Sequence, residues 1–578
     1  MTAPADYDVV IRGGLLVDGS GAAGREADVG VRDGRIAAVG EVPGRGCEEI
    51  DARGQLVTPG FVDVHTHYDA QITWESRLAP SSLHGVTSAV MGNCGVGFAP
   101  CRPADRAVLV EIMEGVEDIP EAVMAEGLPW TWESFGDYLD VIGQRASDID
   151  FGAQVPHSPI RVFAMGSRGA DHEPPTAADL DRMTKLVADA IGAGALGVSS
   201  SRALVHRTRA GKGAPSVHTE QDEMLALARG LRQAGSGVFQ ISPRTVADDI
   251  EPSVEMAMLR RVAVESGRPV SFTLLHRADR PGQLAEMLAL LDAARADGLP
   301  MRAQVCPRPV GVLMGLDLSF HPFLLHPSFA PLQQLPLASR VAAMRDPEMR
   351  RRLLGEKPVH SNPLFVELTS QIDPLCPLGD PPNYEPGEDE TLAARAAKLG
   401  VSPAELAYDL LIADGGRGML LLPASNYVGH SLDAVRPLLG RDGTIVALGD
   451  GGAHYGMLAD SSYPTTILTH WVRDRRGDRI DLARAIRMLS NDPAQALGLC
   501  DRGLVAPGYK ADLNVIDFDR LRLHAPFTRH DLPSGGRRLH QHASGYSATL
   551  VSGIVTYREG EPTGALPGRL IRGARAAA

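Results

Sequence analysis

Alternating apolar and polar residues mark both ends of the chain as β-rich. Residues 27–31 and 35–39 alternate in this way, and Asp33-Gly34 lies between them. An Asp-Gly pair between two alternating runs predicts a β-hairpin, because these residues accept the positive φ angles of a two-residue turn. Residues 511–517 and 547–552 alternate in the same style near the other end. We therefore predict one small β-sandwich domain built from both chain ends.

The long middle of the chain alternates apolar runs with helical patterns. Thr176 is a plausible N-cap for a helix over residues 177–187, and residues 283–291 repeat the helical spacing. Eight runs predict strands, and most of them follow a Gly or Pro turn: 60–64, 86–92, 151–155, 194–199, 237–241, 270–275, 301–305 and 444–448. Strands that alternate with helices predict a parallel sheet. The predicted fold class is α/β, a (β/α)8 TIM-like barrel plus the small β-sandwich domain.

Two long segments interrupt this repeat. Residues from about 101 to 148 are acidic and hold two Trp, and residues from about 311 to 414 carry many Pro and Met. Long excursions after barrel strands become lids and pocket walls. The predicted domains are therefore the β-sandwich over 1–57 and 503–578, and the barrel over 58–502 with these two lid insertions.

Charge and cysteine content narrow the class of protein. The 578 residues carry a formal net charge of -14, which argues against a nucleic-acid partner or an anionic membrane surface. The six cysteines are scattered and form no disulfide framework. We find no signal peptide in the first residues and no apolar run long enough to span a membrane. We expect a cytoplasmic protein with a small-molecule substrate, and its association into a homo-oligomer stays open.

A pair of histidines gives the sharpest chemical signal. His65 and His67 end the apolar strand predicted over 60–64, and two residues that are two apart on a strand point to the same face. Imidazole nitrogens are good zinc ligands. A bare pair of this kind can also be two hydrogen-bonded histidines without a metal, but the apolar strand ahead of it favours the metal.

A carboxylate ends another predicted strand. Asp450 lies between Gly449 and Gly451, directly after the strand predicted over 444–448. Glycines on both sides allow a close approach of the backbone at the barrel rim. A turn-closing or helix-capping aspartate is the alternative. His454, four residues on, would either orient Asp450 or cap the next helix.

The chain resembles a known family at several motifs. Residues 8–14, 58–67 and 506–513 resemble the amidohydrolase superfamily, and within it residues 92–100 and 192–200 resemble the N-acyl-D-amino-acid deacylase (D-aminoacylase) group. This resemblance covers nearly the whole chain. It implies a metal-dependent hydrolase that cleaves a C–N (amide) bond, with Zn²⁺ as cofactor, one or two ions per chain, and an N-acyl (D-)amino acid as substrate.

The resemblance also implies roles for single residues. Cys94, after the second predicted strand, would be a metal ligand, although a small buried core cysteine is the commoner fate of a free thiol. His276, at the end of the sixth strand, would be a further ligand, or a polar residue in a loop. Asp450 would bind metal together with His65 and His67. As general base it would take a proton from water and return it to the leaving nitrogen.

At the fifth strand the chain departs from the group. The group supplies a histidine there, whereas this chain has Gln240 or Ser242 at the corresponding position. Three outcomes follow. The enzyme works with one metal, held by His65, His67 and Asp450 with help from His276; or it holds its metals weakly; or it has left ordinary hydrolysis for a related reaction.

Substrate contacts are predicted more loosely. Arg308, after the seventh strand, is suited to grip a substrate carboxylate. His206, after the fourth strand, and Gln240 are the other candidates for lining the pocket. Two alternatives to the deacylase hypothesis stay open. One is an enzyme acting on another amide, an imide or a carbamate in specialised metabolism, and the other is a catalytically silent barrel acting as a binding or assembly protein.

Overall fold

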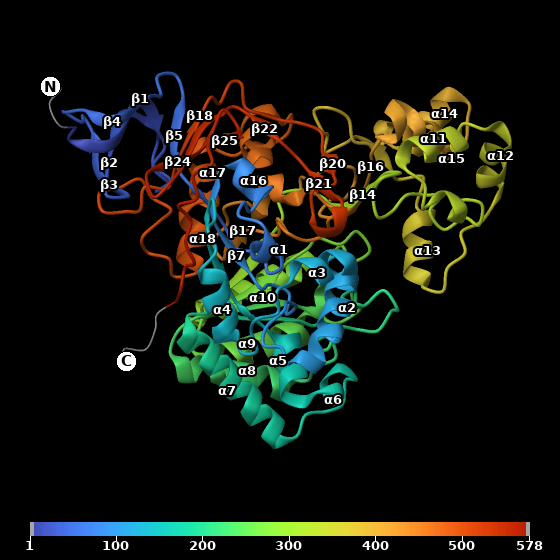
Figure 1. The fold of residues 1–578 in the computed structure, drawn as a ribbon, viewed down its shortest axis with the longest axis horizontal. Helices are drawn as coiled ribbons and strands as arrows, with labels where there is room; N and C mark the ends of the chain where they lie inside the picture. Colours follow the sequence, from blue (N-terminus) through green and yellow to red (C-terminus); the bar gives the residue numbers. More distant parts are fainter. Residues whose placement is uncertain (1–4, 574–578) are drawn as a thin grey trace.

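The computed structural model describes residues 5–573, and strands from both ends of that range share one sheet. The N-terminal segment contributes β1 (Tyr7–Leu16), β2 (Arg25–Arg32), β3 (Arg35–Gly40), β4 (Gly46–Asp51) and β5 (Leu56–Pro59), and the C-terminal segment contributes β18 (Leu513–Ile516), β23 (Tyr546–Val551), β24 (Ile554–Arg558) and β25 (Glu561–Pro562). Their order is β25-β24-β23-β18-β5-β1-β2-β3, with β4 paired to β1. Figure 1 shows the blue N-terminal strands beside the red C-terminal ones.

Local sequence explains how this sheet is joined. Strands β2 and β3 pair antiparallel, and the turn between them holds Asp33 at φ 51° and Gly34 at φ 71°, which confirms the predicted hairpin. Strand β18 pairs antiparallel with β5 on one side and with β23 on the other, so it links the two chain ends. The sandwich arrangement and the limits of the domains stay predictions.

Eight strand positions follow each other along the middle of the chain. They are β6 (Phe61–Asp63), β7 (Val86–Met91), β8 (Asp150–Ala153) continued by β9 (Val155–Pro156), β10 (Gly197–Ser201), β11 (Val238–Ser242), β12 (Val270–Thr273), β13 (Met301–Val305) and β17 (Thr444–Val446). All pairs among them are parallel: β6-β7-β8 form one sheet and β17-β13-β12-β11-β10-β9 another. An isolated parallel bridge between Thr66 and Gly451 connects the segment after β17 back to the segment after β6.

Each predicted strand overlaps one of these elements, and both predicted helices begin as expected but run several residues further. Helix α7 (Ala177–Ala193) begins at the predicted N-cap Thr176, whose side chain accepts from the Asp179 backbone in a capping box. The strand predicted from residue 194 begins only at Gly197. Gly194 has φ 114° and closes α7 in a left-handed conformation, so this glycine ends a helix instead of opening a strand.

The two insertions fold differently from each other. The first carries α2 (Arg106–Val116), α3 (Glu121–Gly127) and α4 (Phe135–Gly143), whose buried residues join the main core. The second carries α11 (Leu337–Met344), α12 (Pro347–Gly355), α13 (Pro363–Ser370), α14 (Leu392–Leu399) and α15 (Pro403–Ile412) and has an apolar cluster of its own. Figure 1 shows these helices as a separate lobe on the right.

Neither membrane-spanning helices nor disulfides occur in the part of the chain that the structure describes. No helix within residues 5–573 has the length and apolar character needed to cross a bilayer. All six cysteines are free, four of them buried and two exposed.

Candidate metal centre

The two histidines of the His-Thr-His motif leave the end of β6 on the same side. The backbone N–H of Thr66, between them, donates to the Val90 carbonyl at 3.0 Å, and the N–H of His67 donates to the Gly451 carbonyl at 2.7 Å. These bonds fix the motif between β7 and the loop after β17. Both imidazoles are 1% exposed, and their ring centroids lie 5.5 Å apart. The motif therefore presents two buried, fixed imidazoles to the neighbouring loops.

The loops after β7 and β17 bring Cys94 and Asp450 to these imidazoles. Cys94 has φ 55° and Asp450 has φ 47°, a region that few residues other than glycine adopt. Such a backbone conformation costs about 1–3 kcal/mol, and it is concentrated at functional sites. Gly452 is required nearby, because its φ is +89° and a Cβ there would lie 2.8 Å from the His67 carbonyl. The strained backbone at Cys94 and Asp450 therefore places these two side chains next to the imidazoles.

His65, His67 and Cys94 form one cluster, and Asp450 lies beside its two imidazoles. His65 Nε2 lies 3.2 Å from Cys94 Sγ and 3.4 Å from Asp450 Oδ1, and His67 Nε2 lies 3.6 Å from the same carboxylate oxygen. The ligand atoms of His65, His67 and Cys94 all lie within 4.8 Å of one another. Donors on a tetrahedral zinc ion at ~2.0–2.3 Å would be separated by about 3.3–3.8 Å. The two imidazoles and the thiol form a cluster that can hold one zinc ion, and the Asp450 carboxylate contacts both imidazoles from outside this cluster.

The electrostatics of the group favour a bound cation. Burial alone would raise the pKa of the Cys94 thiol, but the imidazoles of His65 and His67 override it and lower that pKa to about 5. Burial alone would lower the pKa of His65, but the Cys94 sulfur and the Asp450 carboxylate raise it to about 9. The His67 pKa is also raised, against burial, by Glu117, Asp450 and Cys94. Anionic Cys94 and Asp450 thus hold positive charge on the imidazoles, at the position where a metal cation would replace the protons.

Two residues contact the Nδ1 atoms of the imidazoles. Gln304, on β13, places Oε1 2.6 Å from His65 Nδ1, and its own Nε2 donates to the Ser271 hydroxyl at 2.7 Å. Glu117, at the end of α2, places a carboxylate oxygen 3.5 Å from His67 Nδ1. Both contacts leave the two Nε2 atoms facing Cys94 and Asp450. Partners of this kind fix the ring orientation of metal-binding histidines.

The fifth strand offers no further strong ligand. Gln240, on β11, accepts a hydrogen bond from the Cys94 backbone N–H at 3.0 Å. Ser242 Oγ lies 3.4 Å from Cys94 Sγ and 3.3 Å from Thr273 Oγ1. On this side of the thiol the neighbours are therefore neutral amide and hydroxyl groups. The arrangement favours one cation. Gln240 Oε1 supports the Cys94 loop, and the contact of Gln240 with substrate stays a prediction.

His276 lies outside the cluster of possible metal ligands found among residues 5–573. It comes three residues after the end of β12, and its backbone forms two hydrogen bonds with Asn426. The His276 N–H donates to Asn426 Oδ1 at 2.8 Å, and the Asn426 N–H donates to the His276 carbonyl at 2.7 Å. Within residues 5–573, His276 makes no hydrogen bond or ion pair with the other candidate ligands, so its role as a ligand stays a prediction.

Arg308 also occupies a different environment from the one predicted. Its side chain is 1% exposed, and NH2 lies 3.0 Å from Asp460 Oδ1. NH1 donates to the Ser462 hydroxyl at 2.6 Å, and the guanidinium lies over the Tyr384 ring at 3.4 Å. The structure therefore gives Arg308 an internal ion pair with Asp460, and its predicted contact with a substrate carboxylate stays a prediction.

A cavity of about 970 Å³, here called the rim cavity, opens beside Asp450. His206, a predicted pocket residue, lies in its wall with His454, and Asp450 itself keeps 20% of its side chain exposed. Much of the remaining wall is apolar and comes from the second insertion: Leu318, Phe320, Leu324, Phe329, Phe365 and Leu368. A substrate in the rim cavity would reach Asp450 with one end and apolar side chains with the other.

Three residues around this site were not among the predicted site residues. Glu117 lies in the irregular first insertion, with no motif near it, yet it is 1% exposed and contacts both His67 and His454. Gln304 lies between the apolar Ala303 and Val305 on β13, and a polar side chain at that position could have marked it. Arg537, from the C-terminal segment, lines the rim cavity, and within residues 5–573 no carboxylate lies at ion-pair distance from it.

Known proteins resemble this chain over nearly its full length. The model of the amidohydrolase family matches residues 48–557. The N-acyl-D-aspartate deacylase of Alcaligenes xylosoxydans xylosoxydans is 27% identical over 582 residues, which cover 98% of this chain and 96% of the relative. The N-acyl-D-glutamate deacylase of the same organism is 26% identical over 572 residues, with 98% and 96% covered.

Solved structures share the fold. A D-aminoacylase crystal structure matches with a TM-score of 0.65 at 23% identity, covering 98% of this chain and all of the other. The N-acyl-D-glutamate deacylase of Bordetella bronchiseptica, in complex with zinc and a phosphonate inhibitor, matches with a TM-score of 0.65 at 24% identity, covering 98% and 99%. These matches confirm the resemblance that the sequence motifs indicated.

Proposed function

The chain belongs to the amidohydrolase family, and we propose that it is a zinc-dependent hydrolase that cleaves the amide bond of an N-acyl D-amino acid. One observation carries this proposal: the nitrogen and sulfur donors of His65, His67 and Cys94 form one buried cluster, and Asp450 links it to the rim cavity by contacting both imidazoles. The eight parallel strands, closed by the Thr66–Gly451 bridge, would form a (β/α)8 barrel, with the centre at the carboxyl ends of its strands. The cytoplasmic location stays part of the proposal.

These four residues would hold a single zinc ion. Their donor set suits zinc, and the neutral Gln240 and Ser242 leave the opposite side of Cys94 without strong ligands. Bound zinc supplies Lewis acidity, which activates water near neutral pH and polarises the scissile carbonyl. Gln304 and Glu117 keep the imidazoles in place during the reaction.

Asp450 would transfer a proton from the attacking water to the leaving nitrogen. Its carboxylate faces the two imidazoles and is partly open to the rim cavity, so it can reach both the attacking water and the leaving nitrogen. It accepts a proton from water as the C–O bond forms, and it returns that proton to nitrogen as the C–N bond breaks. The products are a carboxylic acid and a free amine. The pKa of Asp450 is lowered, against burial, by His67 and His65, which keeps the carboxylate ionised.

The rim cavity supports an N-acyl amino acid as substrate. Its apolar wall of Phe320, Phe329 and Phe365 offers burial for an acyl group, and the half-buried guanidinium of Arg537 offers a partner for the substrate carboxylate. The D configuration is proposed from the relatives, which are deacylases of N-acyl-D-aspartate and N-acyl-D-glutamate.

The proposal is tested by turnover and metal content on the same preparation. Purified protein is loaded with zinc and assayed for release of free amine from matched N-acyl D- and L-amino acids, and zinc is counted by elemental analysis. We expect about one zinc per chain and turnover of D substrates. His67→Ala should lose both, whereas His430→Asn, a change at an exposed loop histidine, should lose neither.

Other results would support one of the two alternative functions. Wild-type protein with far less than one zinc per chain and no turnover would support the silent binding or assembly protein. Protein that holds zinc but turns over only imides, carbamates or other amides would support the second enzymatic alternative, which the altered fifth strand favours.

A further inference from the structure

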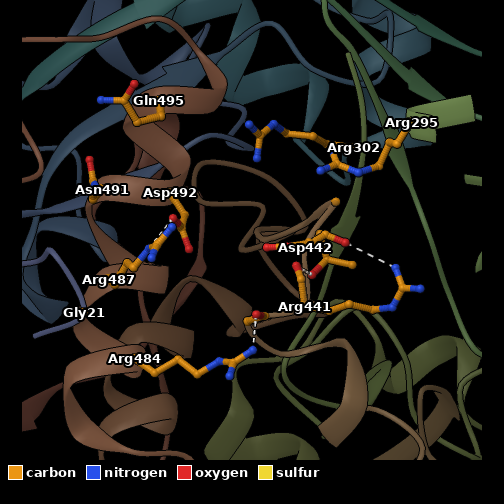
Figure 2. Close-up of a pocket in the computed structure, with 13 residues that line it drawn as sticks. Gly21, Arg295, Arg302, Arg441, Asp442, Arg484, Arg487, Asn491, Asp492 and Gln495 are labelled. Atoms are coloured by element: carbon orange, nitrogen blue, oxygen red, sulfur yellow. Dashed lines mark hydrogen bonds and ion pairs between the residues drawn. The ribbon is translucent and has the colours of Figure 1, made fainter. Parts of the chain in front are cut away.

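A second cavity lies at the opposite ends of the strands that carry the metal centre. This arginine cavity has a volume of about 720 Å³ and lies beside the first residues of β13 and β17. Gln304, at the other end of β13, contacts His65, and Asp450 follows the other end of β17. Figure 2 shows the residues around it: Gly21, Arg295, Arg302, Gly440, Arg441, Asp442, Gly443, Thr444, Arg484, Arg487, Asn491, Asp492 and Gln495.

Positive charge dominates this wall. Five arginines face two aspartates, in a chain whose formal net charge is -14. Arg487 pairs with Asp492 at 2.9 Å, and Arg441 pairs with Asp292, outside the cavity wall, at 2.5 Å. The remaining three arginines have no carboxylate at ion-pair distance in the described part of the chain. An overall acidic protein therefore concentrates uncompensated guanidinium charge in one place.

Arg302 is the most informative of the three. It lies two residues before Gln304 on β13, so its side chain shares the face that Gln304 directs toward His65. Barrel interiors at this level are filled mainly by branched apolar side chains. Arg302 is half-buried there, and within residues 5–573 it makes neither a hydrogen bond nor an ion pair.

A second guanidinium lies next to it. Figure 2 shows Arg295 and Arg302 side by side on one wall. Arg295 NH1 donates to the Met301 carbonyl at 3.2 Å, which holds the Arg295 side chain at the start of β13. Burial, together with the positive charge of Arg295, lowers the pKa of Arg302, and Asp492 and Asp442 oppose this only in part. Two like charges held together at a half-buried position destabilise the folded protein unless an anion joins them.

Glycines make room for these side chains. Gly443 has φ +84°, and a Cβ there would lie 2.8 Å from Arg295 Cδ. Gly440 has φ +76°, and a Cβ there would lie 2.1 Å from Arg484 Nε. The loop before β17 thus lets two arginines approach its backbone, so the wall is built to hold them.

We propose that the arginine cavity binds a small phosphorylated polyanion. Phosphate oxygens accept hydrogen bonds from several guanidinium groups at once, and Arg295 and Arg302 provide two neighbouring planar guanidinium groups. Asn491 and Gln495, on the opposite wall in Figure 2, add amide donors to the same space. The volume is within the range of small-molecule sites. This site is separate from the metal centre and does not depend on the proposed reaction.

Calorimetric titration of the zinc-loaded protein with inorganic pyrophosphate and with ATP, at constant ionic strength, tests the proposal. We expect saturable binding of at least one of them, which Arg302→Gln weakens roughly tenfold or more. ATP binding more tightly than pyrophosphate would identify a nucleoside phosphate, and equal or weaker ATP binding would identify a free polyphosphate. Arg351→Gln, at an exposed arginine paired with Glu348 on α12, is the matched control and should leave the affinity unchanged.

Three results would overturn the proposal. They are no saturable binding of either probe, binding that Arg302→Gln leaves unchanged, and tighter binding of citrate than of both phosphate compounds. Arg295→Gln is the second variant, should Arg302→Gln fold poorly, and thermal melting of each variant reports on its folding.

Discussion

Two arginines near the two ends of strand β13 have opposite environments. Arg308, just past the carboxyl end, is 1% exposed, pairs with Asp460 at 3.0 Å and lies over Tyr384. Arg302, near the amino end, is half-buried and has Arg295 beside it but no carboxylate at ion-pair distance within residues 5–573. Near the carboxyl end, where the candidate metal ligands lie, the arginine has a fixed carboxylate partner, whereas near the amino end two arginines have none among the described residues. This contrast is the one expected from the proposed metal centre at one end and the proposed anion site at the other.

The largest expected effect is on the turnover rate, and it should differ between substitutions at the two ends of β17. Asp450→Asn should lower the turnover rate by about 10²–10⁴-fold, because the variant cannot accept a proton, while most of the zinc stays bound. Asp442→Asn, at the arginine cavity, should leave turnover unchanged. Steady-state kinetics and elemental analysis on both variants check this. Near-normal turnover of Asp450→Asn would remove the proton-transfer role assigned to it.

A matched pair of substitutions tests the two arginines directly. Arg308→Met should destabilise the fold by about 3–5 kcal/mol, since it leaves the buried Asp460 carboxylate without its partner. Arg302→Met should be neutral or stabilising, since it removes a charge that repels Arg295 and buries an apolar chain in its place. Urea midpoints of the two variants and the wild type give the result. Equal destabilisation by both changes would contradict the contrast between the two ends.

The loop that carries Cys94 is expected to depend on Gln240. Gln240→Ala removes the acceptor of the Cys94 N–H and should weaken zinc binding by about 10–100-fold, as loss of a supporting contact commonly does. Competition with a chelator measures the affinity. Gln371→Ala, at an exposed glutamine in the second insertion, is the control. Unchanged zinc affinity in Gln240→Ala would mean that the loop holds its shape without this bond.

The smallest expected effect is a pH slope at Asp460. Burial raises the pKa of this carboxyl from 3.8 to about 6, although Arg308 opposes the shift. Because the folded form keeps a proton that the unfolded chain has released, stability from this group falls as pH rises between 3.8 and about 6. The slope is at most about 1.4 kcal/mol per pH unit. Asp460→Asn should make the urea midpoint less dependent on pH across that window. Parallel curves of midpoint against pH for variant and wild type would contradict the raised pKa of Asp460.

Local patterns predicted the elements well, because each depends on few neighbours. The Asp33-Gly34 hairpin, the Thr176 cap of α7 and the strand Met301–Val305 are all fixed by short-range turn chemistry and apolar periodicity. The strand start at Gly194 was wrong because a glycine between a helix and a strand can serve either, and here it closes the helix.

The site was predicted in part. His65 and His67 were visible because two histidines at the end of an apolar strand form a local pattern, and Cys94 was named from the family motif around it. Glu117 was not predictable, because its contact with His67 bridges two segments that have no common motif. His276 was predicted as a ligand from its place after the sixth strand, and the structure shows its backbone bonded to Asn426, with His276 outside the cluster of His65, His67 and Cys94.

The sequence by itself determined the α/β repeat, the β-rich ends, the resemblance to amidohydrolases and the two imidazoles that can bind a metal. These features follow from periodicity, turn residues and short motifs, which act over a few residues. Only the tertiary structure decided that Arg308 has a carboxylate partner and Arg302 has none, that Gln240 supports Cys94, and that five arginines gather at one cavity. The energy of a charge depends on its neighbours within a few ångströms, and those neighbours come from segments that are far apart in the chain.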